Sequence, residues 1–365
     1  MRVRLEDVCE KESSKLKQSD VIDQNGLYPV YGASGYLGSI NTYQQSNYYV
    51  AVVKDGAGIG RTMLLPPKSS IIGTMQYLMP KDNVHPEYLY YVVKAKHLEK
   101  YFSGATIPHI YFKDYKNEQF DLVSFEKQRD IINRLKKIEI IIDSLSKILV
   151  LLDELVRARF VEMFGDPVDN PMNWKKKKLK DIVTEDCTIS YGIVQTGEDQ
   201  KEGIPVFRPV DIVNHTPKVE ELKKTTEFIS DRYKKTLLKG HELLITVRAN
   251  IADTFIADKE FMGCNVGRGI VPIRTQEDIM RLEFLKCLID NKHLNDILKS
   301  KAKGITLIQL NMEDLRNVEL IIPPIDLQID YLKYSRLIDK SRSRIQKSLE
   351  ASQELFDSLM QEYFS

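Results

Sequence analysis

The sequence has 365 residues, of which 42% are hydrophobic and 29% are charged. This length predicts two or three domains, and this composition excludes collagen-like, disulfide-scaffold and wholly disordered chains. Lysine and arginine (53) nearly balance aspartate and glutamate (52), so the net charge of +1 identifies neither a strongly basic nucleic-acid binder nor an acidic tail.

The chain carries no signal for export or metal binding. Its N-terminus lacks an apolar stretch, and nowhere do about 18 uninterrupted apolar residues occur, so we expect a cytoplasmic protein with no membrane span. No C-x-x-C pair predicts a zinc knuckle or a disulfide framework, and we expect reduced thiols at Cys9, Cys187, Cys264 and Cys287.

The first globular part is predicted to be mixed and β-rich. Residues 48–53 have strand composition, and residues 85–101 show helical spacing. The Gly-rich stretch at 55–62 matches neither a Walker loop nor a Rossmann fingerprint, because its glycines run G-x-G-x-G and Arg61 replaces the P-loop lysine. We interpret it as a tight turn whose flanking basic side chains can meet a phosphate or a base edge.

A long helix is predicted from about residue 126 to residue 164. Its apolar residues alternate steps of three and four, as in the a/d seam of a coiled coil: Leu135, Ile138, Ile142, Leu145, Leu149, Leu152 and Val156. An isolated helix of this length must bury its stripe, either against a second long helix, which we favour, or against its own globular part. After it, Gly165 can supply a C-cap, and Pro167 and Pro171 prevent helical continuation, so we expect a stiff turn.

The second half of the chain repeats the first. Subtracting 200 from six positions gives the same residue types in the first half: Gly304, Thr306, Asp314, Asn317, Gln328 and Asp330. Residues 243–247 have strand composition, and residues 281–299 show helical spacing. The register continues through a second long helix, whose seam residues are Ile338, Ile345, Leu349, Phe356 and Leu359. We therefore predict an α+β chain with two copies of one domain-plus-helix unit.

No catalytic motif occurs. The two Pro-Pro pairs, at 66–67 and 323–324, lack the residues that an amino-methyltransferase needs around them to flip a base. The six histidines form no metal-binding motif, and no G-x-S-x-G elbow is present. Residues 1–125 carry 14 basic and 13 acidic side chains and residues 166–325 carry 25 of each, so neither globular part is basic overall. We expect no catalytic residue, no metal and no cofactor on this chain.

Two similar modules, each followed by a long helix, resemble the specificity (S) subunit of type I restriction-modification enzymes. The resemblance covers essentially the whole chain. It is carried by Phe164-Gly165-Asp166-Pro167 with Asn170-Pro171 and Trp174, by Tyr28 to Gly35, by Gly104 to His109, and by Ile321 to Ile325 with Gln328. One departure is Leu122 to Phe125, where the second copy has Pro-Pro, which leaves the local turn uncertain.

The resemblance implies an architecture with an internal pseudo-twofold repeat. Residues 1–125 would form target recognition domain 1, residues 126–165 the first long helix, residues 166–325 the junction and target recognition domain 2, and residues 326–365 the second long helix. The two helices would form an antiparallel coiled coil that fixes the gap between the halves of a split, asymmetric DNA site. The coiled-coil interface would contain Ile138, Ile142, Leu145, Leu149, Leu152, Val156, Ile338, Ile345, Leu349, Phe356 and Leu359.

The resemblance also implies partners. They would be double-stranded DNA and two DNA adenine methyltransferase (M) subunits that bind S-adenosylmethionine, with motor-nuclease (R) subunits as a further partner. Polar side chains in loops can reach base edges in the major groove. The predicted DNA-contacting residues are Tyr31, Ser34, Lys54, Arg61, Thr106 and His109 in the first module, and Arg208, Asp211, Arg248, Asn250, Arg268, Thr306 and Gln309 in the second. The alternatives are a coiled-coil assembly adapter without sequence-specific DNA binding, and an enzyme with an unrecognised site.

Overall fold

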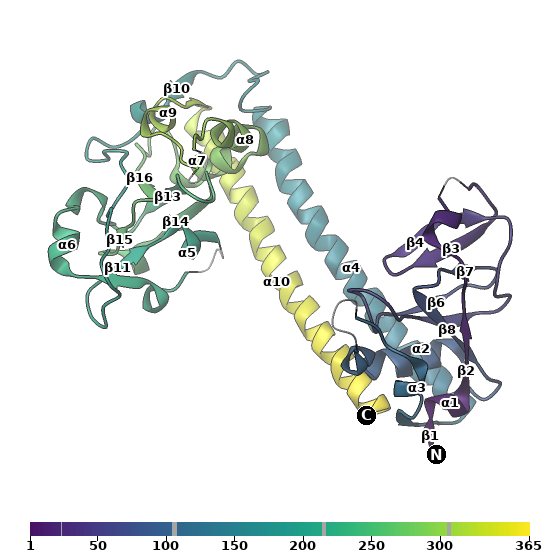
Figure 1. Ribbon diagram of the computed structural model, residues 1–365. Coiled ribbons are helices and arrows are strands. Elements are labelled where there is room, and N and C mark those ends of the chain that lie inside the picture. The colour runs from purple at the N-terminus through teal and green to yellow at the C-terminus, as the bar shows by residue number, and fades with distance from the viewer. Residues whose placement is uncertain (23, 104–107, 214–216, 305–307) are drawn as a thin grey trace. The chain divides into compact units, whose positions relative to one another are not determined.

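The computed structural model describes residues 1–22, 24–103, 108–213, 217–304 and 308–365. The chain divides into two compact units (Figure 1). Unit 1 comprises Met1–Leu149 with Arg344–Ser365, and unit 2 comprises Val150–Ser343. Among the described residues, no helix is long and apolar enough to cross a membrane.

Unit 1 contains a four-stranded antiparallel sheet, a three-stranded sheet and a two-stranded ribbon. In the order of pairing, the strands of the four-stranded sheet are β2 (Cys9–Ser13), β8 (Met75–Pro80), β5 (Tyr49–Val53) and β6 (Thr62–Leu65). Those of the three-stranded sheet are β4 (Gly35–Ile40), β3 (Tyr28–Gly32) and β7 (Ser70–Ile71). The ribbon pairs β1 (Arg2–Arg4) with β9 (Gln119–Asp121). The short helices are α1 (Leu5–Val8), α2 (Pro86–Ala95) and α3 (Phe112–Tyr115). Strand β5 is buried on both faces, since Val50 and Val52 pack in the cluster that contains α2, while Ala51 packs in the cluster of the second sheet.

Unit 2 repeats this plan with one strand fewer in the larger sheet. Its sheets are β14 (Thr254–Ala257), β13 (Glu242–Thr246) and β16 (Ile270–Ile273); β12 (Lys223–Thr225), β11 (Ile204–Phe207) and β15 (Asn265–Val266); and the ribbon of β10 (Lys176–Lys178) with β17 (Glu319–Ile321). Its short helices are α5 (Pro209–Val213), α6 (Glu227–Asp231), α7 (Leu282–Asp290), α8 (Lys292–Ser300) and α9 (Met312–Arg316). Each unit has one three-stranded sheet whose middle strand, β3 or β11, pairs antiparallel with one neighbour and parallel with the other.

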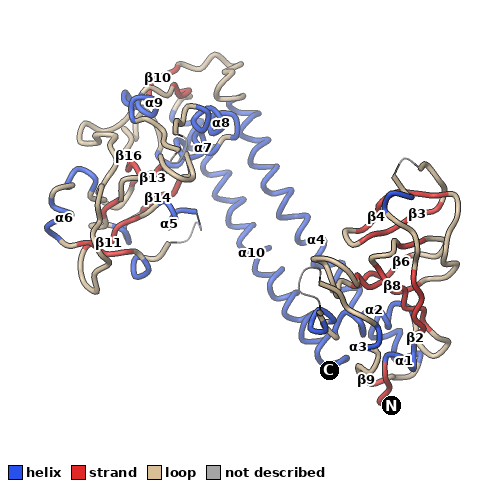
Figure 2. Tube along the Cα trace, in the orientation of Figure 1, coloured by secondary structure: helices blue, strands red, loops and turns tan. Residues whose placement is uncertain are grey.

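The chain has two long helices, α4 (Phe125–Phe164) and α10 (Ile325–Phe364), which Figures 1 and 2 show. Each unit contains part of both helices. At about 1.5 Å per residue, 40 residues make a helix roughly 60 Å long. Gly165 ends α4 as predicted, with a φ of 72° and an amide that donates to the carbonyl of Val161 at 2.8 Å. A Cβ atom at Gly165 would lie 2.5 Å from Cγ of Pro171, so no other residue fits this turn.

The long helices run antiparallel within each unit. In unit 1, Arg134 donates to the hydroxyl of Tyr363, while seam residues Ile138 and Ile142 pack in the cluster that contains Phe356. In unit 2, Asp153 pairs with Arg342, and Phe164 lies against Tyr331 with ring centroids 5.6 Å apart. The predicted seam residues are all buried or half-buried. By contrast, other apolar residues of α4 are exposed: Ile141, Ile148, Leu151 and Leu155.

A fully buried glutamine fixes the start of each long helix. The side chain of Gln328 accepts from the amide of Arg281 at 3.0 Å and donates to the carbonyls of Ile279 and Pro323 at 3.0 and 2.9 Å. Gln128 makes the same three kinds of bond, to His85, Asn83 and Val123. The turn is therefore alike in both copies, and the Pro-Pro pair of the second copy does not change it.

Two predicted helices are shorter than their spacing indicated. The helix expected over residues 85–101 ends at Ala95, because His97 adopts a left-handed conformation with a φ of 49°. The helix expected over residues 281–299 breaks at Asn291, whose side chain accepts hydrogen bonds from the amides of His293 and Leu294 and so starts α8. Apolar spacing continues through both breaks, which is why periodicity alone did not detect them.

The buried glutamine predicts a large effect of one substitution. Gln328→Ala leaves one amide and two carbonyls without their partner, and each unsatisfied buried group costs about 1–3 kcal/mol, so we expect a loss of at least about 3 kcal/mol in the free energy of unfolding. Urea unfolding of unit 2 measures this loss. The matched control is Gln195→Ala, which removes an exposed glutamine from the same unit. Equal stability of the two variants would contradict this account.

Candidate nucleic-acid interface

The same hairpin loop follows the central strand in both units. In unit 1 the loop at 54–61 joins β5 to β6, and the amide of Gly60 donates to the carbonyl of Val53 at 2.9 Å. In unit 2 the shorter loop at 247–253 joins β13 to β14, and the amide of Ala252 donates to the carbonyl of Thr246 at 2.8 Å. These bonds make the two loops structural equivalents.

The two loops need a left-handed backbone at equivalent positions. In unit 1 glycine supplies it, with φ values of 94° at Gly56 and 81° at Gly60. In unit 2 alanine does so, with φ values of 61° at Ala249 and 63° at Ala252. A left-handed non-glycine residue costs about 1–2 kcal/mol, so the unit 2 loop is held under strain. Thr246 helps to hold it, since its hydroxyl accepts from the amide of Asp253 at 2.9 Å.

A second loop lies beside each hairpin loop. The amide of Ile110 donates to the carbonyl of Lys54 at 2.9 Å in unit 1, and the amide of Leu310 donates to that of Val247 at 2.9 Å in unit 2. Isolated bridges pair Asp55 with His109 and, equivalently, Arg248 with Gln309. Each unit therefore presents a two-loop surface, which comprises 54–61 with 108–110 in unit 1 and 247–253 with 308–310 in unit 2.

In unit 2 the segments that carry three predicted arginines lie next to one another beside the two-loop surface. A Cβ atom at Gly269 would lie 2.5 Å from Cγ of Pro209 and 3.3 Å from Cβ of Arg248, so the segments that carry Arg208, Arg248 and Arg268 are in close contact. Arg208 binds the carboxylate of Asp211 through Nε and Nη2, at 3.1 and 2.7 Å. These hydrogen bonds raise the pKa of Arg208. Arg248 donates from Nε to the side-chain oxygen of Gln309 at 2.7 Å.

In unit 1 the corresponding side chains are mixed in charge. Arg61 is exposed and donates to the carbonyl of Ala33 at 2.7 Å, which ties the hairpin loop to the turn between β3 and β4. Lys54 forms an ion pair with Asp55 at 2.5 Å. In β3 of the other sheet, burial raises the pKa of Tyr31.

The remaining predicted contacts are less informative. Ser34 and Asn250 are exposed in the turn after β3 and in the unit 2 hairpin loop, and Arg268 is exposed between β15 and β16. Thr106 and Thr306 lie outside the described residues. Sequence reasoning missed Asp55, which occupies the place of Arg248. A finer alignment of the repeat could have found it, but the offset of 200 does not hold at the front of each half.

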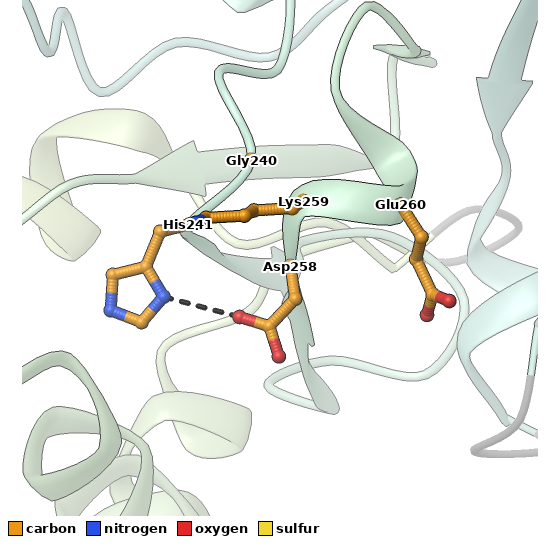
Figure 3. A pocket seen from close by; sticks show the side chains of 5 residues that line it. All are labelled: Gly240, His241, Asp258, Lys259 and Glu260. Atoms are coloured by element: carbon orange, nitrogen blue, oxygen red, sulfur yellow. Dashed lines mark hydrogen bonds and ion pairs between the residues drawn. The ribbon is translucent and has the colours of Figure 1, made fainter.

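Two other polar clusters have structural explanations. The pocket in Figure 3, of about 480 Å³, includes His241, whose Nδ1 lies 3.2 Å from an oxygen of Asp258. Its turn is fixed by the buried carboxylate of Glu242, which accepts from the amides of Gly240 and His241 at 3.0 Å. Figure 3 shows the exposed His241–Asp258 pair beside this turn.

The second cluster lies in the junction after α4. Asp166, Asp169 and His293 are near enough to share one metal ion. However, one oxygen of Asp166 already accepts from the amides of Val168 and Asp169 and lies 3.1 Å from Nδ1 of His293. We interpret the cluster as a tie between the junction and the start of α8.

A family model described as the type I restriction modification DNA specificity domain matches residues 1–153 and again residues 171–351. The chain is 26% identical over 163 residues to the EcoBI specificity subunit of a type I restriction enzyme of Escherichia coli, which covers 45% of this chain and 34% of that protein. It is 26% identical over 281 residues to the MjaIX specificity subunit of Methanocaldococcus jannaschii, which covers 68% of this chain and 61% of that protein. The chain thus spans less than two thirds of the length of either relative.

Solved structures with a similar fold cover the whole chain. The S subunit of the type I restriction-modification system from M. genitalium has a TM-score of 0.64 at 14% identity and covers 100% of this chain and 96% of its own. A chain from a structure of the assembly and conformational transition of the type I R-M system has a TM-score of 0.62 at 16% identity and covers 100% and 97%. This likeness confirms the predicted α+β fold.

The strained hairpin loop of unit 2 generates a prediction. Ala249 is exposed, so Ala249→Gly relieves the left-handed strain without removing a buried methyl group, and we expect unit 2 to gain about 1 kcal/mol of stability. Thermal unfolding measures the gain. In the matched control, Ala158→Gly, the exposed residue is helical and the same change costs about 1 kcal/mol. A fall in stability for both variants would contradict the assignment of strain.

Proposed function

Because the chain belongs to the family of type I restriction-modification DNA specificity domains, we propose that it is the DNA sequence-specificity subunit of such a system. Its two target recognition domains, residues 1–125 and 166–325, each read one half of a split, asymmetric site. The chain itself carries out no catalysis. The methyl donor, S-adenosylmethionine, is bound by a partner methyltransferase.

One observation carries this proposal. The two units present equivalent two-loop surfaces on the same scaffold, but with different polar side chains at matching places. Asp55 and His109 in unit 1 correspond to Arg248 and Gln309 in unit 2. A carboxylate can only accept hydrogen bonds and a guanidinium can only donate them, so two such surfaces select different base pairs. A protein that served only as a coiled-coil adapter would not need this difference.

The long helices support the partner side of the proposal. The seam of α4 is covered, yet Ile141, Ile148, Leu151 and Leu155 remain exposed by 48%, 39%, 59% and 47% on the same helix. Apolar surface of this kind marks interaction sites. We assign it to the docking of the two adenine methyltransferase subunits, with motor-nuclease subunits joining the complex through them. The helix pair then sets the number of base pairs between the two half-sites.

Mapping of methylated adenines tests this function. The chain is co-expressed with a DNA adenine methyltransferase subunit of a type I system, and methylated adenines are located across genomic DNA by single-molecule sequencing. We expect a split motif with a constant gap, because two readers joined by long helices would contact two separate sets of bases. A complex that assembles but methylates nothing, or methylates a single continuous motif, would contradict the proposal.

The control exchanges one reader at a time. Replacing residues 1–125 by the equivalent module of another family member should change one half of the motif and leave the other half and the gap intact. A change in both halves would show that the modules do not read independently.

A further inference from the structure

In unit 2 a hydrogen bond orients the side chain of Arg248. Arg248 is the second residue of the hairpin loop at 247–253, and the residue before it is fixed by two backbone bonds: the amide of Val247 donates to the carbonyl of Gly269 at 2.8 Å, and the carbonyl of Val247 accepts from the amide of Leu310 at 2.9 Å. Its side chain is half-buried and is held at Nε by Gln309, 2.7 Å away. Among the described residues, no carboxylate lies within ion-pair distance of Arg248.

The bond to Gln309 leaves a specific set of donors free. A guanidinium has five N–H groups, and Gln309 uses the one at Nε, so the four at the two terminal nitrogens remain. Two parallel donors match the two acceptors, N7 and O6, that guanine presents in the major groove. Adenine presents an amino group in place of O6, so one N–H donor of the arginine would face a donor instead of an acceptor.

Arg208 contrasts with Arg248. Its Nε and Nη2 both bind Asp211, and the same carboxylate accepts from its backbone amide at 2.7 Å. The side chain of Arg208 is therefore held by hydrogen bonds within its own turn. In unit 1 the place of Arg248 is taken by Asp55, which cannot donate to guanine N7 or O6 and suits an amino group instead.

We propose that Arg248 recognises a guanine in the half-site read by unit 2, and that Gln309 is the positioning residue that orients its guanidinium. This inference rests on the proposed function and narrows it to one base pair. Arg248 contacts the base, whereas Gln309 acts only through Arg248.

Methylation mapping of variants in the full complex tests the inference. Arg248→Ala should leave the gap and the other half-site unchanged, but at one G·C pair the preference for guanine should fall about ten-fold or more, as expected for the loss of a bidentate contact. Arg248→Lys keeps the charge but loses the paired donors, so it should also relax that position while methylation continues. Arg232→Ala removes an exposed arginine from α6's C-terminal end in the same unit, and it should leave the motif unchanged.

Gln309 variants distinguish positioning from general support of the loop. Gln309→Ala should lower the preference at the same G·C pair, whereas Gln309→Glu keeps a side-chain acceptor for Nε and should restore it. Equal loss in both would mean that Gln309 only supports the fold.

The outcomes separate this inference from the proposed function. A split motif for the unaltered chain that stays unchanged in Arg248→Ala would overturn the guanine assignment and leave the function standing. A change at an A·T pair would overturn it as well. Complete loss of methylation in both Arg248 variants would count against it, since one bidentate base contact accounts for roughly 10- to 100-fold. No methylation by the unaltered chain would remove the proposed function itself.

Discussion

The hydrophobic core of each unit depends on a phenylalanine at the C-terminal end of one long helix. Helix α4 begins in unit 1 and ends in the core of unit 2, where Phe164 packs on Phe284 with ring centroids 4.8 Å apart. Helix α10 begins in unit 2 and ends in the core of unit 1, where Phe364 packs on Tyr88 at 5.3 Å. Each core is therefore completed by the end of a helix that starts in the other copy.

This shared scaffold explains how chemistry can vary while geometry is kept. The hairpin loop and its neighbour are fixed mainly by backbone hydrogen bonds, which do not depend on side-chain identity. The left-handed positions are occupied by Gly56 and Gly60 in unit 1 and by two strained alanines in unit 2. The side chains that project from the loops are then free to differ, as Asp55 and Arg248 do. A split recognition site needs this combination of fixed backbone and variable side chains.

Much of this architecture was predictable from the sequence, and the limits have physical causes. A 200-residue offset of identical residues exposed the repeat, and steps of three and four located the seam, because helix periodicity is a strong local signal. The break at Asn291 was missed, since a single side-chain cap leaves apolar spacing intact. The pairing of Arg248 with Gln309 was also beyond sequence reasoning, because it joins two loops 61 positions apart. Both residues were proposed as contacts, but nothing local indicated that they bond to each other.

The dependence of each core on the opposite helix is tested most directly by hydrogen exchange of two reciprocal variants. Phe364→Ala removes a fully buried ring from unit 1, and such a truncation costs about 3–5 kcal/mol. We predict faster amide exchange in α2 and β5, with β13 and α7 of unit 2 unchanged. Phe164→Ala should give the reverse pattern. Faster exchange in both units for either variant, or in neither, would contradict the claim that each helix end completes one core.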